Sequence, residues 1–120
     1  MGRFVIREVP SGVKFDLRAA NGEVVASSEV YTSAALCRRG IASVCKNAAT
    51  QKVEDQTLPN CKQLTNPKYE LYEDKKGQFR FRLRARNGQI IATSEPYTTK
   101  AACENGIESV RSNAADRKTE

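Results

Sequence analysis

The chain carries, at residues 14–49, the stretch KFDLRAANGEVVASSEVYTSAALCRRGIASVCKNAA, and it repeats this stretch at residues 80–115 as RFRLRARNGQIIATSEPYTTKAACENGIESVRSNAA. Between Lys14–Glu54 and Arg80–Glu120, 22 of 41 aligned positions are identical without a gap. A duplication of this kind predicts two copies of one supersecondary unit.

Each copy reads as three strands followed by a helix. In the second copy, Tyr69–Glu73 is a predicted strand, and Gln78–Arg86 alternates apolar with basic residues, as a half-buried strand does. Asn87-Gly88 is a hairpin turn signal, and Gln89–Ser94 is the third strand. The first copy matches, with Asn21-Gly22 before the strand Glu23–Ser28.

A helix follows in each copy, because small and apolar residues recur at helical spacing from Leu36 to Val44 and from Ala102 to Val110. Its cap is Thr32 or Ser33 in the first copy and Thr98 or Thr99 in the second. Glycine at both matching mid-helix positions, Gly40 and Gly106, predicts a close approach by the sheet or by the sister helix.

The predicted fold class is α+β, with two βββα repeats forming one six-stranded antiparallel sheet that has both helices on one face. The repeats span residues 1–50 and 68–120, residues 51–67 form a linker without clear periodicity, and both repeats share a single compact domain.

The motif NGxxxAxSExYTxxAxCxxGIxSVxxNA, found twice after an FRFRLRA-type strand, resembles the YegP-like family of tandem-repeat bacterial proteins. The resemblance covers nearly the whole chain except the linker. It implies the same βββα pair in one sheet and a bacterial, cytoplasmic location. It assigns no functional residues.

The composition excludes several catalytic classes. The chain has no histidine, so Ser-His and Cys-His nucleophile pairs are impossible. Without histidine we expect no enzyme, and we expect no cofactor. We also expect no metal, since the four cysteines contain no Cys-x-x-Cys pair. Cys37 and Cys103 fall on the apolar helix stripe and are predicted to be reduced and buried, whereas Cys61 lies in the linker.

The repeated Ser28-Glu29-x-Tyr31-Thr32 motif and its copy, Ser94-Glu95-x-Tyr97-Thr98, have two interpretations. Their side chains bind a small ligand beside the start of the helix, or they anchor the strand-to-helix connection to the core. Their duplication favours the structural interpretation, because both copies must solve the same folding problem.

The candidate binding surface is the basic face of residues 78–86. A net charge of +6 permits a polyanionic partner without establishing one. An exposed sheet face with arginines and an aromatic ring can bind single-stranded nucleic acid through phosphate contacts and stacking. The alternative is ordinary cross-strand pairing of these arginines with Glu70 and Asp74. The candidate residues are Arg80, Arg82, Arg84, Arg86, Tyr72, Lys14 and Arg18.

We therefore expect a non-catalytic binding module, with single-stranded nucleic acid or another polyanion as partner. The alternative is a structural or stress-related protein that acts through an unidentified protein partner. No apolar run is long enough to cross a membrane, and a monomer or weak dimer is expected because the duplication already supplies a partner for one edge of each sheet.

Overall fold

The computed structural model describes residues 2–115 and 117–119, with side chains described through residue 115. In chain order the elements are β1 (Gly2–Val9), β2 (Gly12–Arg18), β3 (Val24–Ser27), α1 (Ala34–Asn47), β4 (Val53–Asp55), β5 (Lys68–Glu73), β6 (Phe79–Arg84), β7 (Ile90–Thr93), α2 (Lys100–Ala115) and β8 (Arg117–Thr119).

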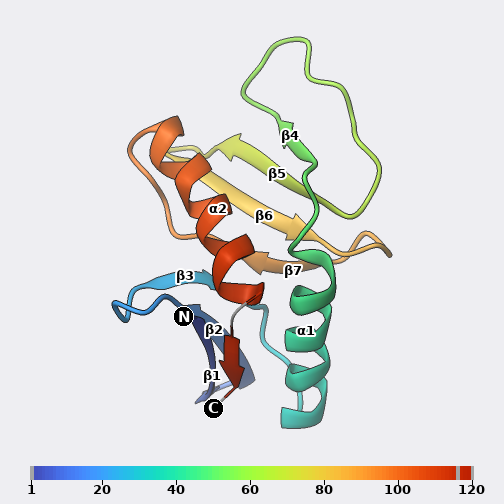
Figure 1. Ribbon diagram of the computed structural model, residues 1–120, viewed down its shortest axis with the longest axis vertical. Coiled ribbons are helices and arrows are strands. Elements are labelled where there is room, and N and C mark those ends of the chain that lie inside the picture. Colours follow the sequence, from blue (N-terminus) through green and yellow to red (C-terminus); the bar gives the residue numbers. More distant parts are fainter. Residues whose placement is uncertain (1, 116, 120) are drawn as a thin grey trace.

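All strands belong to one sheet, in the order β4-β5-β6-β7-β3-β2-β1-β8, and both helices lie over the same face of it (Figure 1). The two repeats meet at the centre, where Ser27 of β3 is paired antiparallel with Thr93 of β7. The α+β class and the two helices agree with the prediction.

The prediction of six antiparallel strands was incomplete, because the sheet is mixed. Each helix leads into a short strand that pairs in parallel with the first strand of the other repeat, β4 with β5 and β8 with β1. Consequently the segment 51–67, predicted as a linker, contains a strand. Three residues are too few for a period-2 pattern to stand out from the sequence around it.

The predicted hairpins are present with slightly shorter strands. Gly22 and Gly88 have φ of 86° and 89°, the left-handed region that favours glycine in such turns. The predicted strand 78–86 ends at Arg84, because the hairpin turn begins at Ala85, whose carbonyl accepts a hydrogen bond from the Gly88 N–H at 2.9 Å. Arg86 therefore lies in the turn and not on the strand.

Each helix begins directly after one of its predicted cap residues. Ser33 Oγ accepts a hydrogen bond from the Leu36 N–H, and Thr99 Oγ1 accepts one from the Ala102 N–H. Of the two predicted cap positions in each copy, the second is the one used.

The core lies between the helices and the sheet, where Phe15, Leu17, Phe81 and Leu83 are fully buried. Cys37 and Cys103 are buried there as free thiols, as predicted, and Cys61 is exposed. In the part of the chain that is described, no helix is long and apolar enough to cross a membrane.

Candidate polyanion-binding face

The sheet face opposite the helices carries the predicted basic residues of the second repeat. Strand register places Arg80 opposite Tyr72, Arg82 opposite Glu70, and Arg84 opposite Lys68. Because side chains alternate across a strand, all six lie on this face while Phe81 and Leu83 point into the core. We call the face formed by these six residues the basic face.

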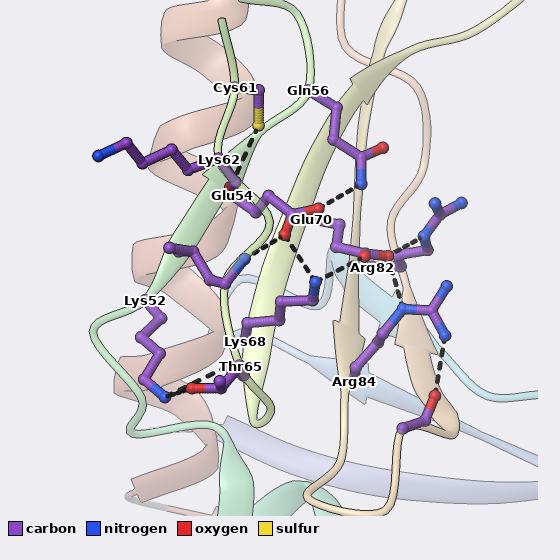
Figure 2. Close-up of polar contacts among 12 residues, drawn as sticks. Lys52, Glu54, Gln56, Cys61, Lys62, Thr65, Lys68, Glu70, Arg82 and Arg84 are labelled. Carbon is purple, nitrogen blue, oxygen red and sulfur yellow. Dashed lines mark hydrogen bonds and ion pairs between the residues drawn. The ribbon is translucent and has the colours of Figure 1, made fainter.

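A buried ion cluster anchors the basic face (Figure 2). Glu70 Oε1 accepts hydrogen bonds from Arg82 Nε at 2.6 Å and from Arg84 Nε at 2.7 Å, and its Oε2 lies 3.3 Å from Lys68 Nζ. Lys68 Nζ also donates to Glu54 Oε1 at 2.6 Å. The side chains of Glu54, Glu70 and Lys68 are only about 5% exposed.

The loop between β4 and β5 covers one end of this face and completes the cluster. Glu54 accepts hydrogen bonds from Gln56 Nε2 and from the Leu64 backbone N–H, each at 2.7 Å. Lys52 Nζ donates to Thr65 Oγ1 at 2.7 Å and so ties the far side of the loop to the segment before β4. Buried charges require such partners, since an unpaired one would be strongly destabilising.

These contacts shift the ionisation of the cluster toward its charged forms. Burial by itself would raise the pKa of Glu54, but hydrogen bonds from Lys68, Gln56 and the Leu64 N–H hold that pKa at about 2. Burial likewise opposes the charge of Glu70, whose pKa is nevertheless lowered by Arg82 and Arg84. The pKa of Lys68 is raised by its two carboxylate partners despite its burial.

The two other arginines of the predicted row, Arg80 and Arg86, are held less tightly. Arg80 Nε donates to Asp74 at 3.0 Å, and its side chain is 38% exposed. The guanidinium carbon of Arg82 lies 4.6 Å from the centroid of the Tyr72 ring and covers it. Arg86 is exposed in the turn after β6, with no hydrogen bond or ion pair among the described residues. The cross-strand pairing with Glu70 and Asp74, the alternative that the sequence offered, is thus present for Arg80, Arg82 and Arg84.

Lys14 and Arg18 do not join this group. They lie on β2, on the same side of the sheet, but β7 and β3 separate β2 from β6. Three strand spacings amount to about 14 Å. In the first repeat an acidic residue occupies the middle of the face instead, where Asp16 binds Arg7 at 2.8 Å and accepts from the Ser27 hydroxyl at 2.7 Å.

Sequence reasoning missed Glu54 and Lys68, the two residues that hold the cluster together. The alternation Lys68-Tyr69-Glu70-Leu71-Tyr72 extends the polar side of β5 to Lys68 and was a usable signal. No sequence signal pointed to Glu54, because this residue becomes a neighbour of Glu70 only when β4 pairs with β5 in the sheet.

The repeated tyrosine motif has a structural role in the fold. Tyr31 and Tyr97 pack against the hydrophobic core, and their rings stack on Phe15 and Phe81 with centroids 6.4 Å apart in both copies. The Ser28 and Ser94 hydroxyls accept hydrogen bonds from the backbone N–H groups of Phe15 and Phe81. These contacts agree with the interpretation that the motif holds the connection onto the core.

Comparisons with known proteins agree on one family for this chain. The model described as "Domain of unknown function (DUF1508)" matches residues 12–55 and 74–120, one match in each repeat. The chain is 36% identical to the UPF0339 protein YegP of Yersinia pestis over 94% of this chain and 88% of that one. It is 42% identical to a UPF0339 protein of Mannheimia succiniciproducens, over 84% and 76% of the two chains.

Solved structures share the fold as well. The solution NMR structure of yegP from E. coli, described as a protein of unknown function, superposes with a TM-score of 0.81 at 32% identity and covers 99% of this chain and 90% of its own. A UPF0339 protein from Shewanella oneidensis superposes with a TM-score of 0.78, covering 98% and 90%. The chain therefore belongs to the YegP-like family of bacterial α+β proteins, whose domain model carries no established function.

Proposed function

We propose that this protein is a non-catalytic binding module whose basic face in the second repeat binds a polyanion, single-stranded nucleic acid foremost. One observation carries the proposal. Arg82 and Arg84 are anchored at Nε by the buried Glu70, while both terminal nitrogens of Arg82 and one of Arg84 have no partner among the described residues (Figure 2).

This arrangement suits phosphate binding for an entropic reason. A free arginine loses much side-chain freedom when it binds, which offsets the gain from the new hydrogen bonds. Here the inner nitrogen is already held, so the guanidinium is oriented before the ligand arrives. Arg80, Arg82 and Arg84 also recur at every second residue of one strand, about 6.8 Å apart, and so present a row of evenly spaced positive charges.

The ionisation of the cluster supports binding over acid–base catalysis. A general acid or base works best with a pKa close to the working pH. Glu54 and Glu70 have lowered pKa values and Lys68 a raised one, so all three stay charged near neutrality. Such groups stabilise and orient neighbouring charges but exchange protons poorly.

The test is a salt titration of binding to a fluorescently labelled 12-nucleotide thymidine strand, followed by anisotropy. Three or four phosphate contacts predict a log–log slope of about −2 to −3, from roughly −0.7 per contact. Arg82→Gln leaves Glu70 with two cations and is expected to flatten the slope by about 0.7. Arg39→Gln, which removes an equal charge from an exposed position of α1, is the matched control and should change the slope little. No salt-dependent binding at low ionic strength would refute the proposal.

A structural or stress-related role through a protein partner is the second candidate, and the Tyr72 contact favours it. Base stacking on Tyr72 requires Arg82 to leave the ring that it covers. An acidic protein segment would bind the outer guanidinium nitrogens without that movement. Tighter binding of poly-glutamate than of the thymidine strand at equal ionic strength would support this second candidate against the first.

We also propose that the protein is a monomer or weak dimer. A cytoplasmic location is proposed because the family resemblance implies it. Both exposed sheet edges are three-residue strands, β4 and β8, which offer little backbone for pairing with another chain. Light scattering at micromolar concentration is expected to give the mass of one chain. A stable tetramer would contradict this assembly state.

A further inference from the structure

A pocket lies beside the basic face, where the loop before β5 approaches the turn after β6. Its volume is about 660 Å³, within the range of small-molecule sites. Its walls come from β5 with the loop before it and from the end of β6 with the turn after it, and the lining residues are Gln63, Leu64, Thr65, Asn66, Lys68, Glu70, Arg84, Arg86 and Gly88. The loop segment has no counterpart in the duplicated stretches, so this pocket is a feature of one side of the molecule.

The charge around the pocket is unbalanced. Lys68, Arg82 and Arg84 meet only two carboxylates, Glu54 and Glu70, which leaves the buried cluster with a net charge of +1. Arg86 adds a second positive charge at the pocket wall and has no acidic partner among the described residues. A ligand with two negative charges would therefore neutralise this end of the basic face.

Two guanidinium groups are available to hold such a ligand. Arg84 is fixed through Nε by Glu70 and through Nη1 by the Gly88 carbonyl at 2.8 Å, which leaves Nη2 free. No guanidinium nitrogen of Arg86 has a partner among the described residues. Arg86 can therefore bind phosphate oxygens through paired hydrogen bonds, while Arg84 adds a single one from Nη2, and the planar pairing favours a phosphate over a spherical anion.

A third polar group indicates what the phosphate is attached to. Asn66 lines the pocket, and its Oδ1 atom is buried with no hydrogen-bond partner in the described part of the chain. A buried acceptor of this kind calls for a donor, such as a ligand hydroxyl. The pocket is also larger than a phosphate group alone needs, and Leu64 gives it an apolar patch.

Folding does not demand this arrangement, as the first repeat shows. There Ala20 stands at the position of Arg86, and Arg18 stands at that of Arg84. The same hairpin forms in both repeats, with closely similar φ at Gly22 and Gly88. Arg86 is thus an addition that the turn does not require.

We propose that this pocket binds a phosphate monoester of a hydroxylated molecule, with Arg84 and Arg86 on the phosphate and Asn66 Oδ1 accepting from a hydroxyl. The site is distinct from the proposed binding of a polymer along β6, although the two share Arg84. The phosphate monoester can belong to a free sugar phosphate or to the 5′ end of a nucleic acid strand.

The test uses the ¹⁵N-labelled full chain and ribose 5-phosphate, followed by amide chemical-shift changes. Shifts are expected at residues 63–66 and at Gly88, saturating with a millimolar or lower dissociation constant, whereas ribose should cause none at equal concentration. Arg86→Gln should weaken binding at least tenfold, because this exposed side chain has no structural partner to lose. Lys76→Gln, which removes an equal charge outside the pocket, is the control and should weaken it less than twofold.

Two further arms define the ligand. Asn66→Ser should weaken the binding of ribose 5-phosphate more than that of inorganic phosphate, because only the former has a sugar hydroxyl to place on Asn66. A 5′-phosphorylated four-nucleotide strand that binds more tightly than ribose 5-phosphate, at the same residues, identifies a strand end as the source; the reverse order identifies a free sugar phosphate. Equal shifts from ribose and ribose 5-phosphate, or binding unchanged by Arg86→Gln, would overturn the proposal. Binding of the unphosphorylated 12-nucleotide strand tests the polymer proposal separately.

Discussion

The ring of Tyr97 lies directly over Gly106, so that a Cβ atom at this glycine would stand 2.8 Å from Tyr97 Cζ. Tyr31 and Gly40 repeat the contact at 2.7 Å. The predicted close approach at the mid-helix glycines is therefore real. The nearest partner is the tyrosine of the strand-to-helix connection, and the predicted approach of the sheet is present as well, because Phe81 Cε2 of β6 would stand 3.0 Å from the Cβ atom at Gly106.

Gly106→Ala is expected to destabilise the protein by up to about 2 kcal/mol, because the added methyl overpacks the Tyr97 contact at a cost of roughly 1–3 kcal/mol. The better helix propensity of alanine, about 1 kcal/mol, opposes this and does not outweigh it. Urea unfolding followed by circular dichroism measures the change. Adding Tyr97→Phe should recover part of the loss, since the hydroxyl oxygen is also in close contact. A single variant more stable than the parent would contradict the packing argument.

Lys68→Met is expected to cost about 3–5 kcal/mol of unfolding free energy, because it leaves Glu54 as an unpaired buried charge. The double variant Lys68→Met with Glu54→Gln should recover at least half of that loss. Glu70 remains paired with Arg82 and Arg84 in the double variant, so no buried charge is left alone. A double variant no more stable than Lys68→Met would show that the lysine acts by packing and not by charge.

Stability is expected to fall in acid between about pH 5 and pH 2. The pKa of Glu54 in the folded protein, about 2, lies below its ordinary value, so its stabilising contribution is full above that ordinary value and is lost as the pH falls through the folded one. For Glu54 the loss is roughly 3 kcal/mol. Unfolding free energies measured at a series of pH values should show a shallower acid limb in Glu54→Gln. Glu104→Gln, on the exposed side of α2, should retain the steep limb.

Thiol labelling of the native protein should proceed in the order of exposure. Cys61 is exposed and should react first, Cys45 is half-buried, and Cys37 and Cys103 are buried in the core. Burial also raises the pKa of Cys103 to about 11, which keeps the reactive thiolate scarce at pH 8. Mass spectrometry of a time course reads out each site. Labelling of Cys37 or Cys103 as fast as Cys61 would show that the helix–sheet core opens readily.

The repeat, its turns and its helix starts could be predicted from sequence because each depends on local chemistry. Asn87-Gly88 supplies a positive φ at its glycine, and Ser33 and Thr99 supply cap hydroxyls within three residues of the N–H groups they bind. The alternation along β6 likewise records which side chains face the core. These signals lie within a few residues of the structure that they specify.

The position of Arg86 marks where local signals end. Alternation alone extends the strand through this residue, but the chain leaves the sheet before it, in a turn closed by the hydrogen bond from the Gly88 N–H to the Ala85 carbonyl. The register shift that precedes this turn, between Leu83 and Arg84, involves pairing with β7 and not residues 84–86 alone. The same change places Arg86 at the pocket wall instead of in line with the other arginines.

The sequence by itself therefore determined the two-repeat α+β architecture and the basic face of β6, because duplication, alternation and turn residues act locally. Only the tertiary structure decided how β4 crosses to the other repeat, how Glu54 and Lys68 meet Glu70, and how the loop lines the pocket beside Arg84. The physical reason is that a buried ion cluster forms from strands paired across the whole sheet. Its energy depends on desolvation and on partners distant in sequence, which no local pattern records.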